Sequence, residues 1–122
     1  MQPLIVEKIK KMTQPLIDKG FKFLSLYEKG GDSSCVYICR YQKGRDFFDW
    51  REVSGSNEIN FKVFVDGEYS FPTLKKINPK KYRAFCLKHI LLPTTMDEKR
   101  KFVAEILVEY IQHTDEFFGI KL

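Results

Sequence analysis

The stretch that decides the fold runs from Ser34 to Phe71, 34-SCVYICRYQKGRDFFDWREVSGSNEINFKVFVDGEYSF-71. Apolar and polar residues alternate through much of it, which is the two-residue period of a half-buried β-strand. Short glycine-containing segments interrupt the alternation, and one of them, Asp66-Gly67, is a pair favoured in tight hairpin turns. Because short turns join strands that run in opposite directions, the stretch predicts an antiparallel meander.

The breaks in the alternation place the individual strands. A strand over residues 21–28 precedes the quoted stretch, and Lys29-Gly30-Gly31-Asp32 is expected to form the loop or hairpin after it. Three more strands are expected over residues 34–42, 46–53 and 59–65. Residues 68–71 form a short extended piece that can pair back as one more strand, so the meander has four or five strands.

Two regions beside the meander have the spacing of helices. Residues 4–19 place apolar side chains three and four positions apart, and Pro15 is expected to kink this helix or to start a second turn. A second helix begins at Asn78-Pro79, since Asn is a favoured N-cap and Pro suits the first helical position. It ends at Pro93 and is apolar on two opposite sides, which is typical of a helix sandwiched between other elements.

A third helix completes the predicted fold. Thr95 and Glu98 form a capping box at its start, its apolar face continues to Phe118, and Gly119 is expected to end it. Helices segregated from an antiparallel meander indicate an α+β fold. We therefore expect a two-layer domain over residues 1–122 with an N-terminal helix, a four- to five-stranded antiparallel β-meander and two C-terminal helices.

Length and composition narrow the class of protein. The chain has 122 residues, of which 43% are hydrophobic and 30% charged, as in one ordinary globular domain. An amphipathic segment follows Met1 in place of the apolar core of a secretory signal, and no apolar run has the length of a bilayer span. Three cysteines are too few for a disulfide framework. These features predict a soluble cytoplasmic protein with reduced thiols, no metal and no cofactor.

A basic segment is the first candidate binding site. Residues 72–92 contain six Lys and Arg side chains and no acid. Four of the lysines flank the start of the second helix, where the helix dipole is already positive, and together with its free N–H groups they can bind a phosphate or carboxylate. This candidate anion site consists of Lys75, Lys76, Lys80 and Lys81. The alternative is a solubilising charge, neutralised if Asp97, Glu105 or Glu109 folds against it.

The sheet is the second candidate. If the helices cover one face, aromatic side chains on the other face can contact a partner. The residues expected on this open face are Tyr37, Tyr41, Phe48 and Trp50. Asp46, Asp49 and Glu52 on the same strands would repel a nucleic-acid backbone, which favours a protein partner. The alternative is that these aromatic side chains belong to the core.

Catalysis has the weakest support in the sequence. Cys86 and His89 lie one helical turn apart, close enough for a thiolate–imidazole pair, but both fall on an apolar side where packed side chains are commoner. The motifs of phosphate-binding loops, serine hydrolases, zinc proteases and dinucleotide-binding folds are absent from the sequence. The sequence thus predicts a non-catalytic module that binds a protein through the aromatic-rich sheet face. A nucleic-acid or anion binder using residues 75–88 is the alternative, and no membrane partner is expected.

Overall fold

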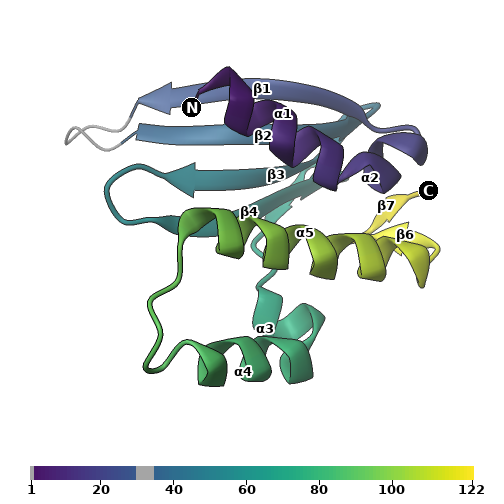
Figure 1. The fold of residues 1–122 in the computed structure, drawn as a ribbon. Helices are drawn as coiled ribbons and strands as arrows, with labels where there is room; N and C mark the ends of the chain where they lie inside the picture. Colours follow the sequence, from purple (N-terminus) through teal and green to yellow (C-terminus); the bar gives the residue numbers. More distant parts are fainter. Residues whose placement is uncertain (1, 30–34) are drawn as a thin grey trace.

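A five-stranded antiparallel sheet forms the centre of the structure, a computed structural model that describes residues 2–29 and 35–122 (Figure 1). Its strands are β1 (Lys22–Lys29), β2 (Cys35–Lys43), β3 (Asp46–Val53), β4 (Glu58–Val65) and β5 (Glu68–Ser70), and each pairs with the next. The predicted α+β fold with an antiparallel sheet is therefore confirmed. Most of the loop expected at residues 29–32 lies outside the described residues. No helix in the described ranges is long and apolar enough to cross a membrane.

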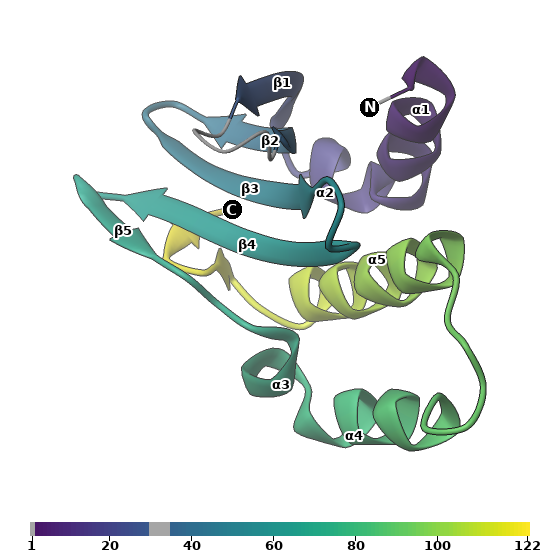
Figure 2. The ribbon, with the colours of Figure 1, turned by 90° about the vertical axis from the view of Figure 1, so that its left-hand side faces the viewer.

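Helices and a small hairpin cover one face of this sheet (Figure 2). The helices are α1 (Pro3–Met12), α2 (Gln14–Asp18), α3 (Leu74–Ile77), α4 (Pro79–Lys88) and α5 (Met96–Gln112). The hairpin consists of β6 (Glu116–Phe117) and β7 (Ile120–Lys121). In both views α1, α2 and α5 lie on one side of the sheet, and α4 lies beyond α5, farther from the strands. Leu74 and Ile77 of α3 still pack against the core.

The core lies between the sheet and these covering elements. The strand period places alternate side chains of β2, β3 and β4 on the covered face, and each of them is at most 3% exposed: Cys39, Tyr41, Phe48, Trp50, Phe61 and Val63. Val103, Leu107 and Ile111 of α5 pack against them from the helical side. Burial of apolar area of this kind is the dominant favourable term in folding.

The expected open aromatic face is wrong for three of its four residues. Tyr41, Phe48 and Trp50 are fully buried and so cannot contact a partner. Tyr37 shares their face and is half-buried near the end of the strands. Strand alternation shows which side chains lie on the same face, but it does not show which face the helices will cover.

The break near Pro15 follows one of the two expectations for the first helix, whereas the last helix ends earlier than its spacing predicts. The first helix stops at Met12 and restarts before Pro15, and Thr13 between the two halves bonds the Ile9 carbonyl through its hydroxyl at 2.7 Å. At the other end α5 stops at Gln112, and the chain reaches Phe117 through a hairpin in place of a longer helix. Phe117 still enters the core, where its ring lies 4.8 Å from that of Phe48. Aromatic spacing alone does not distinguish these two routes into the core.

Candidate functional site

The α3–α4 arm, residues 72–95, contains the basic segment. Thr73 caps α3 by accepting the Lys76 N–H at 3.3 Å, and Asn78 caps α4 by accepting the Lys81 N–H at 3.1 Å. The predicted Asn78-Pro79 helix start is therefore confirmed. Since Asn78 is both the end of α3 and the N-cap of α4, the two helices meet at one residue.

One side of α4 packs against α5. The rings of Phe85 and Phe102 stack with centroids 4.1 Å apart and planes 6° from parallel, and Lys81 forms an ion pair with Glu109. The packing is loose, because a pocket of about 280 Å³ lies between α4, α5 and β4 and has Tyr82 and Ile59 in its lining. Protein interiors leave few voids larger than a water molecule. None of the ten residues of α4 is buried.

The opposite side of α4 and the loop that follows it expose a set of large apolar side chains. We call this set the apolar cluster, and its exposed fractions are 62% for Leu87, 68% for Ile90, 90% for Leu91 and 60% for Leu92. The sequence predicts that α4 is sandwiched between two elements. In the described ranges it packs on one side, against α5, so the apolar cluster has no cover there.

The four lysines of the candidate anion site are all exposed on α3 and α4, but they are not equivalent. Lys81 is paired with Glu109, one of the acids whose approach would neutralise the cluster, and this ammonium lowers the pKa of the Glu109 carboxyl. Lys75, Lys76 and Lys80 form no ion pair with any described residue. The arm therefore keeps most of its positive charge at the surface.

Cys86 and His89 have partners other than each other. His89 Nδ1 lies 3.2 Å from the Leu92 carbonyl oxygen, and its ring packs against Phe85 with centroids 4.5 Å apart. His89 Nε2 lies 3.8 Å from the Glu98 carboxylate. Cys86 is exposed, and its thiol beside Tyr82 raises the pKa of that phenol. The histidine thus packs against the end of α4 and the loop after it, and its Nε2 forms no hydrogen bond with a described residue.

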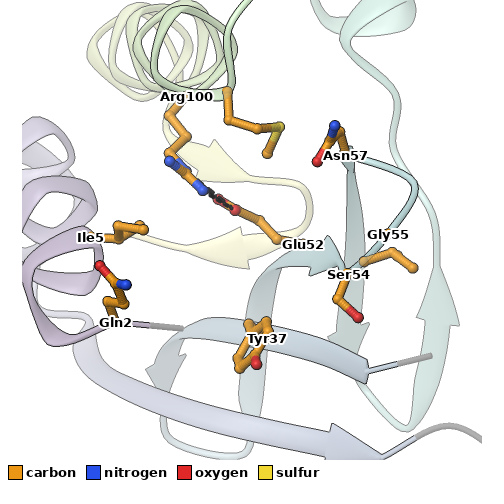
Figure 3. A pocket seen from close by; sticks show the side chains of 10 residues that line it. Gln2, Ile5, Tyr37, Glu52, Ser54, Gly55, Asn57 and Arg100 are labelled. Atoms are coloured by element: carbon orange, nitrogen blue, oxygen red, sulfur yellow. Dashed lines mark hydrogen bonds and ion pairs between the residues drawn. The ribbon is translucent and has the colours of Figure 1, made fainter. Parts of the chain in front are cut away.

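A second recess of about 530 Å³ lies between the start of α1, the start of α5 and the β3–β4 turn (Figure 3). Its inner wall contains a buried ion pair, in which Arg100 donates to the Glu52 carboxylate from Nη2 at 2.8 Å and from Nε at 3.0 Å. Trp50 Nε1 also donates to Glu52, and Asp97 accepts from Arg100 Nη1. Every charged group here has a partner within the chain, so this pair joins α5 to the sheet.

The buried ion pair of Glu52 and Arg100 was not expected from the sequence. Glu52 is expected above to repel a nucleic-acid backbone, which requires an accessible carboxylate, whereas it is 5% exposed on the covered face. A signal for this was present, because Glu52 follows Trp50 by two residues and so shares its face. Arg100 lies at an apolar position of α5 and is 9% exposed.

The sheet face that no described helix covers has its own aromatic residues. Arg40 lies 3.7 Å over the ring of Phe47 and forms a two-point ion pair with Asp49, with nitrogen–oxygen distances of 2.8 and 2.9 Å. Phe64 stacks on Phe47, and Tyr69 packs beside Phe64. Several side chains on this face pair with one another, and Phe47 is only 9% exposed. The buried Arg51 Nε on the same face has no hydrogen-bond partner among the described residues.

Comparison of the chain with protein-family models, with curated proteins and with solved structures gives no match.

Proposed function

We propose that this protein is a non-catalytic binding module whose docking surface for another protein is the outer side of the α3–α4 arm. The observation that carries the proposal is the apolar cluster, in which Leu87, Ile90, Leu91 and Leu92 are all at least 60% exposed. Isolated exposed apolar side chains are normal on protein surfaces, but a contiguous group usually marks an interaction site. Burying one such side chain fully is worth about 1.5–3 kcal/mol.

The charges around the apolar cluster indicate the chemistry of the partner. Lys80, Arg83 and Lys88 lie on the same helix as Leu87, and the segment 72–92 contains no acid. A complementary surface has an apolar centre and an acidic rim, because such a rim speeds encounter and excludes other basic surfaces. We therefore propose an acidic protein as the partner, in place of one that binds the sheet face.

A second candidate function is supported by the unpaired lysines. Lys75, Lys76 and Lys80 remain free of described acids, so the arm can also bind a nucleic-acid backbone electrostatically. This candidate makes no use of the apolar cluster. The two functions therefore differ in their dependence on salt and on Leu91.

Site-specific photo-crosslinking distinguishes these candidates. A photo-reactive amino acid at Leu91 is compared with the same amino acid at Leu4 of α1, which is also strongly exposed, at 68%. We expect the Leu91 position to crosslink an acidic protein that the Leu4 position does not, and expect Leu87→Ser to abolish that crosslink. The purified partner is then expected to bind the wild-type module at high salt, because apolar contacts are not screened.

Two other results would overturn the proposal. Crosslinking to nucleic acid, with binding that falls steeply as salt rises, would favour the second candidate. Binding to vesicles that contain phosphatidylserine, lost with Leu91→Ser, would assign the surface to a membrane.

A further inference from the structure

The outer edge of β1 is a surface separate from the arm. No strand in the described ranges pairs with it. β1 is an edge strand of eight residues, whereas β5 at the other edge has three. An edge strand presents unpaired N–H and C=O groups, and proteins usually protect it with a proline, a bulge, a charge at its centre or a short length. β1 has none of these protections: it pairs with β2 in unbroken register, and its centre, residues 23–27, is uncharged.

The sequence of β1 is complementary to itself. Where two copies of a strand pair antiparallel about a two-fold axis perpendicular to the sheet, opposite residues point to the same face, so their numbers must sum to an even value. With Ser25 on the axis, Leu24 lies opposite Leu26 of the second copy and Phe23 lies opposite Tyr27. At the ends of the ladder Lys22 lies opposite Glu28. Every pair in this register is of a favourable type.

Registers shifted by one pair lack this match. With Leu26 on the axis, Leu24 would face Glu28 and Phe23 would face Lys29; with Leu24 on the axis, Lys22 would face Leu26. The charge complementarity of Lys22 and Glu28 therefore selects the register centred on Ser25. These two residues are six positions apart on one strand, about 20 Å, so they do not pair within one chain.

The flanks of β1 leave room for this pairing. Ser25 and Tyr27 point to the helix-covered face yet are exposed, and Tyr27 is 56% exposed, so these two side chains remain accessible at the edge beside α1. Leu26, on the opposite face, is 36% exposed. The edge also lies at the far end of the molecule from α4 (Figures 1 and 2), so both surfaces can be occupied together.

We propose that β1 is a homodimerisation edge, on which a second copy of the chain adds its own β1 antiparallel, with Ser25 at the two-fold axis. The two sheets then become one continuous sheet, with four cross-strand pairs of apolar or aromatic side chains and two Lys22–Glu28 pairs. The second copy is the occupant that the strand's own sequence fits. This inference is independent of the docking surface on the arm.

Charge exchange tests the proposal in sedimentation experiments over a wide range of protein concentration. Wild type is expected to dimerise. Lys22→Glu and Glu28→Lys each create two like-charge pairs and are expected to raise the dimer dissociation constant about tenfold. The double variant Lys22→Glu/Glu28→Lys is expected to restore the dissociation constant of the wild-type dimer. An equimolar mixture of the two single variants is expected to form heterodimers, since the carboxylates of one variant then face the ammoniums of the other at both ends of the ladder.

The controls are Lys101→Glu and Glu105→Lys, two charge changes at exposed positions of α5, which are expected to leave the dissociation constant unchanged. All these variants alter exposed side chains, so loss of folding does not explain their effects. A wild-type protein that remains monomeric at every concentration would overturn the proposal. A dimer that is equally stable in both single variants would also overturn it, because it would use another surface.

Discussion

At the scale of single residues, the Glu52 carboxylate joins β3 to α5. It accepts one hydrogen bond from the Trp50 indole beside it and three from the Nε and Nη2 atoms of Arg100 of α5. A buried ion pair is not in itself strong evidence of stability, because desolvation of the two charges offsets their attraction. Removing one member is different, since the remaining buried charge then has no partner.

Replacing Glu52 with Gln is therefore expected to destabilise the protein by about 3 kcal/mol. The amide is close in shape to the carboxylate but cannot balance the charge of Arg100, which is 9% exposed. Urea unfolding monitored by circular dichroism measures the change.

Asp97→Asn is the matched control, because Asp97 contacts the same guanidinium from an exposed position, with 66% of its side chain accessible. Loss of the Asp97 charge is expected to lower the free energy of unfolding by less than about 1 kcal/mol. Equal destabilisation by the two substitutions would contradict the structural role assigned to Glu52.

The buried thiol of Cys39 makes the free energy of unfolding depend on pH in the alkaline range. Burial raises the pKa of the Cys39 thiol from 9.0 to about 12, and the nearby negative charge of Glu52 acts in the same direction. The folded chain thus keeps this proton at pH values where the unfolded chain has lost it. The stability contributed by the neutral thiol is expected to be complete below pH 9.0 and to be lost as the pH rises towards about 12. Urea midpoints measured across this range test the expectation.

Cys39→Ala supplies the comparison for that pH series. The variant is expected to be less stable at neutral pH, because a buried side chain becomes smaller, but to lose less stability between pH 9.0 and about 12. Tyr41 contributes to the fall in stability with rising pH in both proteins, since burial raises the pKa of its phenol as well. Parallel curves for the two proteins would show that Cys39 does not titrate as described.

At the scale of elements, α4 depends on its contact with α5. The stacked rings of Phe85 and Phe102 are the closest aromatic pair between them. Phe102→Ala is expected to increase hydrogen exchange of the α4 amides by about tenfold or more while the amides of β2 and β3 keep their protection. Hydrogen exchange followed by mass spectrometry resolves the two regions.

Leu87→Ala is the control on the exposed side of the same helix. It removes an apolar side chain that contacts little of the chain, and it is expected to leave the exchange of α4 nearly unchanged. If the sheet and α4 instead exchange together in Phe102→Ala, the arm is not a separate unit of local stability.

Local chemistry made several elements predictable from the sequence. Asp66-Gly67 forms the predicted tight turn with φ of 51° and 80°, the conformation that Asp-Gly pairs favour. Thr95 caps α5 as expected by accepting the Glu98 N–H at 3.1 Å. Each of these signals depends on neighbouring residues only, so no tertiary contact is needed to recognise it.

Other features depend on contacts between distant residues. The face of the sheet that α5 covers is decided by packing across the molecule, and for this reason Tyr41, Phe48 and Trp50 belong to the core and not to an open surface. The lysine segment and the apolar residues 90–92 could be seen in the sequence as patterns. Their exposure could not, because it follows from α4 packing on one side only.

At the scale of the whole molecule, the arm and the β1 edge lie at opposite ends of the sheet and helix layers (Figures 1 and 2). If a dimer forms through β1, each copy presents its own apolar cluster. A partner that also has two binding sites would then bind more tightly through both at once.

Binding of an acidic protein by the apolar cluster is tested by comparing the affinities of variants for the crosslinked partner after its purification. We expect the double variant Leu87→Ser/Leu91→Ser to weaken binding about a hundredfold, because two side chains with exposed fractions of 62% and 90% no longer become buried. Leu4→Ser, a change of the same kind on α1, is expected to bind as wild type does. Equal affinity of the double variant and wild type would show that the apolar cluster is not the docking surface.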